Sequence, residues 1–297
     1  MWIREKLREL VHHDSLLWRR ALAAGVTYGP DFWVRYSPPV FGLAFSAALP
    51  RQRAVVRRTL RKALGPRPAW QELCDVARVF MNFAGSMTDA MLVGSQRGYT
   101  AQSKPVGRQH LAEALAQGRG VIAATAHTAG WDAGAGILRN VYPAEVLVVM
   151  EPEAASAARE LHDARRERTG VRIVHVGPDP LASLPLLHHL RRGHGVVAMK
   201  FDRLHPRMRS RAVRFFGAPW RIAEGPLSLA ALTGAPIVPV FTRRLGFLEY
   251  ECMAAPAITL APKPTEQALN GAAQQLASAL EAFVQRHPTS WFRFSES

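Results

Sequence analysis

The sequence has few cysteines, few acidic residues and no long apolar run. Cys74 and Cys252 are its two cysteines, each in an apolar stretch. This excludes a disulfide framework or a cysteine metal cluster, and predicts two buried thiols in a reducing compartment. No segment approaches the roughly 18 apolar residues of a spanning helix, and residues 1–10 lack the apolar core of a signal peptide. We therefore expect a cytoplasmic chain.

The shortage of acidic residues leaves the chain strongly basic. Lys and Arg number 38 against 23 Asp and Glu, a formal net charge of +15. Such an excess favours an anionic partner. Nucleic acid is disfavoured, because aromatic and basic residues do not interleave and no nucleic-acid motif occurs. Residues 1–24 and 38–50 suit contact with an anionic membrane surface, although packing within a helical lobe explains their apolar spacing equally well.

Two kinds of pattern divide the chain. Apolar residues at helical spacing predict helices over 51–64 and 70–92. From residue 106, short apolar runs alternate with helical segments, which is typical of a mainly parallel sheet flanked by helices. The predicted strands are 120–126, 145–150, 171–176, 195–200 and 235–241, and the predicted helices are 107–117, 153–168, 180–192, 225–233 and 266–286. We expect a single α/β domain over 1–297, with a helical N-terminal lobe (1–105) and a catalytic core (106–297).

A histidine and an aspartate follow the first predicted strand of the core. His127 stands at the carboxyl end of that strand, where ligands gather in open α/β sheets. Gly130 permits a sharp turn, and Asp132 begins the next helix, whose dipole keeps a carboxylate ionised. One tight turn would bring Asp132 to one imidazole nitrogen and leave the other free to take a proton from a hydroxyl or amine. A loop histidine and a helix-capping aspartate are the alternative.

The pair favours direct attack by an acceptor. A covalent mechanism needs an activated Ser or Cys, and the chain contains no G-x-S-x-G elbow. Metal catalysis is disfavoured as well, because the adjacent histidine pairs at 12–13 and 188–189 lack metal-ligand spacing.

The stretch HTAGWD (127–132) resembles the H-x4-D/E motif of the lipid A biosynthesis lauroyl/myristoyl acyltransferase family. That family belongs to the bacterial lysophospholipid acyltransferase-like superfamily and is related to phosphatidylinositol mannoside acyltransferases. Residues 190–203, 212–244 and 287–294 are similar to later segments of the family in the same order. The resemblance covers roughly residues 30–297 and implies a glycerol-phosphate-acyltransferase-like α/β fold.

The resemblance also implies a reaction. A fatty acyl group would pass from an acyl-carrier-protein or CoA thioester to a hydroxyl, or an amine, of a lipid or glycolipid acceptor, without a cofactor or metal. His127 would be the general base and Asp132 its partner. The resemblance places Asp202 and Arg203 in the site wall, and Arg243 and Arg244 at phosphate or the developing oxyanion.

The expected substrate contacts are Asp202, Arg203, Arg243, Arg244, Trp131 and Phe216. Phe216 would line an acyl channel. Structural ion pairs, solvated charges at a strand end and plain core aromatics are the alternatives for these side chains.

The chain departs from the family in two ways. Gly130-Trp131-Asp132 stands where Asn-Trp-Glu is common, and the usual membrane-spanning anchor does not appear in the sequence. Both differences are compatible with the chemistry but put lipid A itself in doubt as the acceptor. Ala126 precedes His127 where the broader glycerol-phosphate acyltransferases have Asn, which disfavours a close relationship with those enzymes.

Two other functions fit the same sequence. On the same fold, water in place of the acceptor would make the protein an acyl-thioester hydrolase. A non-enzymatic protein that binds membrane surfaces would use the basic segment 51–64. We expect an acyltransferase that is peripheral on the inner face of the cell membrane.

Overall fold

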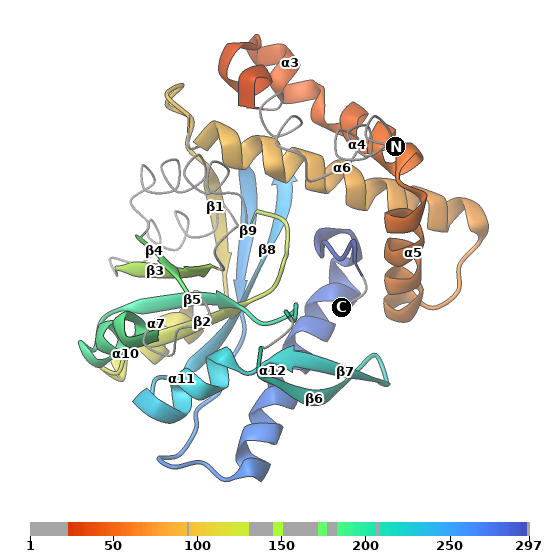
Figure 1. Ribbon diagram of the computed structural model, residues 1–297. Coiled ribbons are helices and arrows are strands. Elements are labelled where there is room, and N and C mark those ends of the chain that lie inside the picture. Colours follow the sequence, from red (N-terminus) through yellow and green to blue (C-terminus); the bar gives the residue numbers. More distant parts are fainter. Residues whose placement is uncertain are drawn as a thin grey trace, which may run out of the picture.

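The computed structural model describes residues 23–93, 95–130, 145–150, 172–176, 183–205 and 208–295. Its core is a seven-stranded sheet in the order β1-β9-β8-β2-β5-β3-β4 (Figure 1). Neighbouring strands run parallel except β8 and β9, which form an antiparallel pair. The predicted α/β class with a mainly parallel sheet is therefore confirmed.

The strands of the sheet match the predicted apolar runs at five places. They are β2 (Val121–Thr125), β3 (Val146–Met150), β4 (Arg172–His175), β5 (Val196–Lys200) and β8 (Ile237–Gly246), and the sheet also includes β1 (Gln102–Val106) and β9 (Glu249–Ala254). Every residue of β2 is buried, because β2 lies between two strands and both of its faces are covered. The sheet begins within the last residues that we assigned to the N-terminal lobe.

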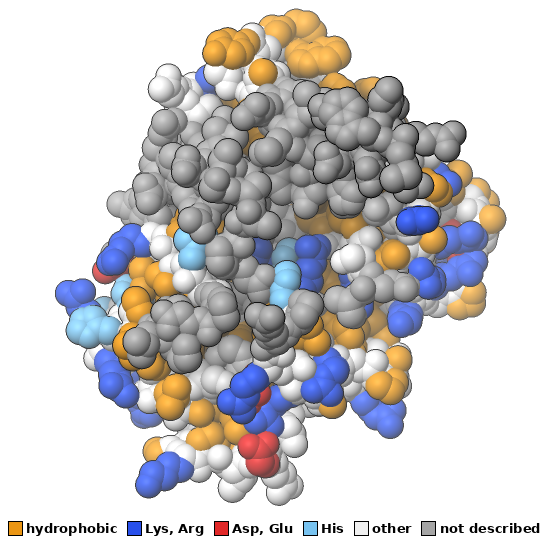
Figure 2. Space-filling view, in the orientation of Figure 1, with side chains coloured by type: hydrophobic (Ala, Val, Ile, Leu, Met, Phe, Trp, Pro, Cys, Tyr) orange, Lys and Arg blue, Asp and Glu red, His pale blue; other side chains and the backbone are white. Residues whose placement is uncertain are grey.

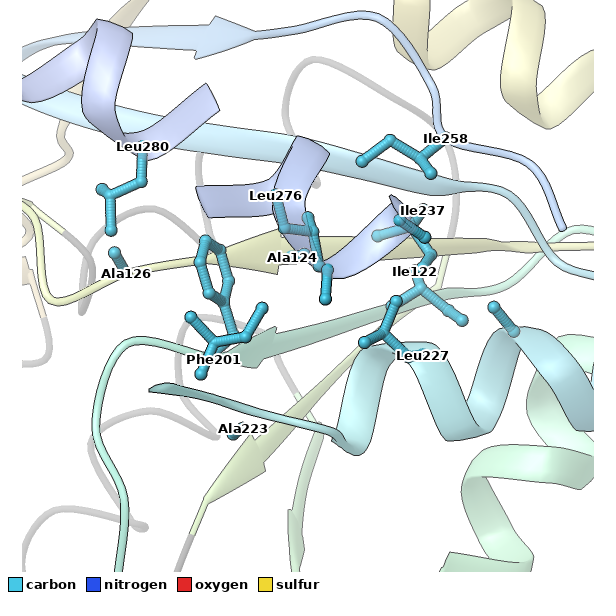
Figure 3. Packing of buried hydrophobic residues seen from close by; sticks show 14 of the residues in the cluster. Ile122, Ala124, Ala126, Phe201, Ala223, Leu227, Ile237, Ile258, Leu276 and Leu280 are labelled. Carbon is cyan, nitrogen blue, oxygen red and sulfur yellow. The ribbon is translucent and has the colours of Figure 1, made fainter. Parts of the chain in front are cut away.

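The two faces of β2 contribute to two separate clusters. Ile122 and Ala124 pack against α10 (Leu184–Arg191), α11 (Gly225–Thr233) and α12 (Glu266–Arg286), and Figure 3 shows them among Leu227, Leu276 and Leu280. Val121 and Ala123 face the other side, where α7 (Arg108–Ala116) covers the sheet. This period of two is the expected side-chain alternation of a strand.

A two-stranded hairpin outside the main sheet was not predicted. It pairs β6 (Ser210–Phe215) with β7 (Ala218–Ala223), and a two-residue turn joins them. Phe216 and Gly217 in that turn both have positive φ, 49° and 71°. Two successive positive φ values are typical of a type I′ turn, whose twist matches that of the flanking strands.

The N-terminal lobe is helical, as predicted. Residues 23–28 are helical, and α3 (Asp31–Tyr36), α4 (Pro38–Ala48), α5 (Pro50–Leu64) and α6 (Ala69–Val93) follow. The long helix α6 lies across one end of the sheet (Figure 1), and the 3-10 turn η2 (Pro288–Ser290) contacts it. The predicted helix at 153–168 and nearly all of the amphipathic stretch 1–24 lie outside the described residues.

One sequence expectation for this lobe is wrong. Cys74 on α6 is exposed, whereas Cys252 on β9 of the core is buried as expected. Near Cys74, the buried face of α6 instead carries Glu72 and Asp75, which accept hydrogen bonds from Arg61 and Arg67, respectively.

Within the described residues, no helix combines the length and the apolarity needed to cross a bilayer.

Candidate active site

His127 and Asp202 meet because of the register between β2 and β5. Thr125 and Lys200 are paired at the ends of these adjacent parallel strands, and His127 and Asp202 each follow two positions later. The backbone pairing continues one step beyond the strands, since the Phe201 N–H donates to the Thr125 carbonyl at 3.0 Å. The two side chains therefore leave the carboxyl ends of neighbouring strands at the same level.

Asp202 is held by three hydrogen bonds. Its Oδ1 lies 2.7 Å from His127 Nδ1, and its Oδ2 accepts from the His127 backbone N–H at 3.0 Å. The indole Nε1–H of Trp291 donates to the same Oδ2 at 2.9 Å. The Asp202 residue is only 3% exposed, so these donors take the place of water around the carboxylate. His127 retains more contact with solvent, with 24% of its side chain exposed.

The charges at the site favour an ionised aspartate and a neutral histidine. Burial alone would raise the pKa of Asp202, but the His127 ring and the N–H donors outweigh it and hold that pKa well below its usual range. Burial lowers the pKa of His127, and the charges of Lys200 and Arg203 add to this against the opposing effect of Asp202. An ionised carboxylate accepts hydrogen bonds only, so Nδ1 carries the imidazole proton and Nε2 carries the lone pair.

The C-terminal segment fixes the loop that carries His127. The Phe292 N–H donates to the His127 carbonyl at 2.8 Å, and the Ala129 N–H donates to the Ser290 carbonyl at 2.8 Å. Between these bonds, Thr128 and Trp291 form an antiparallel bridge. On its other side the loop meets β8, where the Thr242 N–H donates to the Thr128 hydroxyl at 3.2 Å.

Gly130 ends the described part of this loop in a conformation that suits glycine. Its φ is +83°, and a Cβ at this position would lie 2.2 Å from Cε1 of Tyr250. The sharp turn expected from the sequence is therefore present, and it rests directly on the Tyr250 ring. The Tyr250 hydroxyl donates to the fully buried carboxylate of Asp89 at 2.7 Å, so the loop is supported by the N-terminal lobe.

The sequence is similar to a family of bacterial acyltransferases along most of its length. Residues 18–296 match the model of the bacterial lipid A biosynthesis acyltransferases. The chain belongs to this family. The match spans the strands, the His127 loop and the C-terminal segment, so the family's sequence pattern covers every element that builds the site.

Two curated relatives of the chain are phosphatidylinositol mannoside acyltransferases of Mycobacterium tuberculosis, from strains ATCC 25618 / H37Rv and CDC 1551 / Oshkosh. Each is 28% identical to it over 189 residues, which is 62% of this chain. The matched stretch spans 56% of the length of each relative. These enzymes are thus distant relatives that align over part of their length.

Arg203 and Phe216, two of the expected substrate contacts, lie beside the C-terminal part of the chain. The Arg203 guanidinium donates to the Phe292 carbonyl at 2.6 Å, and it thereby joins the C-terminal segment to Asp202. Phe216 lies in the hairpin turn, where its N–H donates to Glu281 at 2.7 Å and its ring centroid is 4.5 Å from that of Phe215. Contact of these two side chains with substrate remains a prediction.

The two expected arginines of β8 have carboxylate partners. Arg243 donates to Glu251 at 2.6 Å, and Arg244 donates to Asp89 at 2.7 Å. The Arg243 side chain is 34% exposed and that of Arg244 is 16% exposed, so Arg243 is the more accessible of the two. A role of either residue at phosphate or at an oxyanion remains a prediction.

Asp132 and Trp131 lie outside the described residues, so the predicted contact between Asp132 and His127 stays a prediction. The carboxylate that the structure does bring to His127 is Asp202, which the sequence analysis assigned to the site wall. Trp291 was missed altogether as a site residue. Within the described part of the chain, no cluster of three or more His, Cys, Asp or Glu side chains forms a metal site.

Proposed function

We propose that the protein transfers a fatty acyl group from a thioester donor to a hydroxyl of a lipid or glycolipid acceptor, with His127 as the general base. The observation that supports this role is the 2.7 Å contact of His127 Nδ1 with buried Asp202, which leaves Nε2 as the proton acceptor. Membership of the acyltransferase family supports the reaction class.

The reaction proceeds by direct attack. Nε2 of His127 removes the proton of the acceptor hydroxyl as its oxygen bonds to the thioester carbonyl carbon. The ionised Asp202 stabilises the imidazolium that forms. When the carbon–sulfur bond breaks, the proton passes from Nε2 to the departing thiolate, so the products are an ester and a free thiol and the histidine is again neutral.

The acceptor is proposed to be a glycosylated lipid. The relatives carry the name phosphatidylinositol mannoside acyltransferase, which points to a sugar hydroxyl on a membrane lipid. The donor is an acyl-carrier-protein or CoA thioester, and both contain a phosphopantetheine arm. Of the two β8 arginines, we assign phosphate contact first to Arg243, because its side chain is the more accessible.

The proposal is tested by incubating the purified protein with a bacterial lipid extract and thioesters of mixed chain length on both donors. Mass spectrometry should then find a new acylated lipid that the His127→Ala variant does not make. The matched control is His188→Ala, which removes an exposed histidine on α10 and should leave the product unchanged.

Two other results of this experiment have defined meanings. Free fatty acid that depends on His127, without an acylated lipid, would replace the transferase by the hydrolase on the same fold. A product that His127→Ala makes as fast as the unmodified protein would exclude the general-base role altogether.

A further inference from the structure

Helix α4 exposes Val40, Phe41 and Leu43 to solvent, and its buried positions are small residues. Its buried residues are Pro38, Gly42 and Ser46. A Cβ on Gly42 would lie 2.6 Å from the Met81 Cα, so the backbones of α4 and α6 are in close contact along this face. Small residues at a helix contact and large apolar residues on the opposite side are the arrangement of helices that face lipid.

The exposed apolar surface continues from α4 onto α3 and the residues before it. The ring centroids of Trp33 on α3 and Phe41 on α4 are 6.3 Å apart in an edge-to-face contact, so the two helices form one surface. We call it the α3–α4 face; its side chains and their exposed fractions are Tyr28 86%, Phe32 66%, Trp33 49%, Tyr36 66%, Val40 65%, Phe41 45% and Leu43 48%. Figure 2 shows hydrophobic side chains gathered at the top of the molecule, where α3 lies in Figure 1.

The residue types of the α3–α4 face are typical of proteins at the membrane–water interface. Tyr and Trp have an apolar ring and one polar group, and they concentrate where hydrocarbon meets headgroups. A contiguous exposed apolar patch on a folded protein marks a surface that another phase or molecule covers. The remaining choice is between a lipid surface and another protein.

The basic residues near the face favour anionic lipid over a second copy of the chain. Between Asp31 and Glu72 the chain has no acidic residue and eight basic ones, which are Arg35, Arg51, Arg53, Arg57, Arg58, Arg61, Lys62 and Arg67. Arg57 and Arg61 are paired with Glu72, and Arg67 is paired with Asp75. Arg35 on α3 and Arg51 and Arg53 at the start of α5 adjoin the face along the chain, and two copies joined through it would bring these like charges together, at a net charge of +15 each. Anionic headgroups would neutralise them, because Lys and Arg near a negatively charged bilayer are attracted to it.

We propose that the α3–α4 face is the surface by which the protein docks onto a bilayer rich in anionic lipid, with its aromatic side chains at the level of the headgroups. The docking proposal rests on the proposed function in one respect: docking would bring the His127 site to an acceptor embedded in the membrane. The contact itself requires neither donor nor acceptor.

Vesicle sedimentation tests the proposal without any substrate. The unmodified protein should sediment with phosphatidylcholine vesicles that contain about one third phosphatidylglycerol, and binding should weaken as salt rises from about 0.1 M to about 0.5 M. The Phe32→Ser/Val40→Ser double variant should lose about ten-fold or more of the partition coefficient, since two apolar side chains no longer enter the interface.

The control removes equally exposed apolar side chains elsewhere. Leu184 on α10 and Leu232 on α11 are 52% and 62% exposed, so Leu184→Ser/Leu232→Ser should bind vesicles as the unmodified protein does. Equal melting temperatures of the two double variants would show that neither result comes from unfolding. Equal vesicle binding of the two double variants would overturn the proposal.

Two more measurements separate the rival explanations. If light scattering finds a dimer that only Phe32→Ser/Val40→Ser dissociates, with vesicle binding unchanged, the face is an interface between copies and the proposal is overturned. Vesicle binding by His127→Ala should equal that of the unmodified protein, and the α3–α4 variant should keep its transfer rate on a detergent-dispersed acceptor. Loss of transfer alone would therefore count against the proposed function and not against docking.

Discussion

The Asp202→Asn substitution is the sharpest test of the site, because it changes hydrogen-bonding chemistry and almost nothing else. In the native protein, Oδ2 accepts from the His127 N–H at 3.0 Å and from Trp291 at 2.9 Å. In the native protein, Oδ1 of Asp202 lies 2.7 Å from His127 Nδ1. If the asparagine keeps its oxygen at the position of Oδ2, its NH₂ group takes the position of Oδ1 and faces Nδ1. Nδ1 must then accept, so the imidazole proton moves to Nε2 and the lone pair that the proposed mechanism uses is lost.

The expected loss follows from that change of tautomer. In a histidine–aspartate pair, replacing the carboxylate by an amide costs about 10³- to 10⁴-fold in kcat. This corresponds to about 4 to 5.5 kcal/mol of transition-state stabilisation. Asp202 is almost completely buried, so no water can enter to accept from Nδ1 in its place.

The assay is single-turnover acyl transfer at saturating thioester, with Asp132→Asn measured beside Asp202→Asn. Both variants should melt within a few degrees of the unmodified protein, since each change preserves side-chain volume. If Asp202→Asn costs less than about ten-fold while Asp132→Asn costs a thousand-fold, Asp132 is the partner of His127 and the reasoning from Asp202 is wrong.

Three further predictions follow from other features of the site. In the proposed mechanism His127 acts in its neutral form, and its pKa lies below the ordinary value of 6.5, so kcat/KM should fall with decreasing pH through a midpoint below 6.5; a midpoint above 7 in the pH–rate profile would contradict this. Gly130→Ala should cost about 1–3 kcal/mol of stability and most of the activity, because φ is +83° and Tyr250 occupies the space for a Cβ; an unchanged thermal melt and rate would exclude a strained turn. With a thiol reagent, exposed Cys74 should react in the native protein and Cys252, whose pKa burial raises to about 12, should react only after unfolding; two fast thiols would show that β9 is not covered.

The sheet was largely predictable because its central strands are continuous apolar runs. The five predicted strands and the helices α5, α6, α7, α10, α11 and α12 are present close to their expected bounds. The edge strand β1 and its neighbour β9 were missed for a physical reason. β1 carries Pro105 and is mostly exposed, and β9 buries only alternate residues such as Tyr250 and Cys252, so neither has a strong apolar signal.

The sequence contained part of the information needed to predict the contact between His127 and Asp202. Each residue stands seven positions after a glycine that begins an apolar strand, Gly120 in one case and Gly195 in the other. If the two strands were known to be adjacent and parallel, equal offsets would place the side chains opposite each other. Adjacency is a property of the tertiary fold, and no periodicity within either segment reports it.

The exposed Cys74 shows where helical periodicity misleads. The neighbouring apolar residues suggested a buried thiol, but Glu72 and Asp75 occupy the inner face of α6. The Arg61 guanidinium donates to Glu72 at 2.5 Å, so an ion pair replaces apolar packing at this contact. A pattern of apolar residues alone cannot detect a face that is buried through paired charges.

The contacts of Ser290, Trp291 and Phe292 with the His127 loop and Asp202 also determine at what stage of synthesis the site can form. His127 emerges from the ribosome early, but the donors and acceptors that orient it and Asp202 come from the other end of the described chain. A nascent chain that has completed β2 and β5 still lacks the indole N–H and the backbone pairing of the loop. The proposed base is therefore oriented only after residue 292 has been made, and a translation product that stops before that residue would carry the histidine without these contacts.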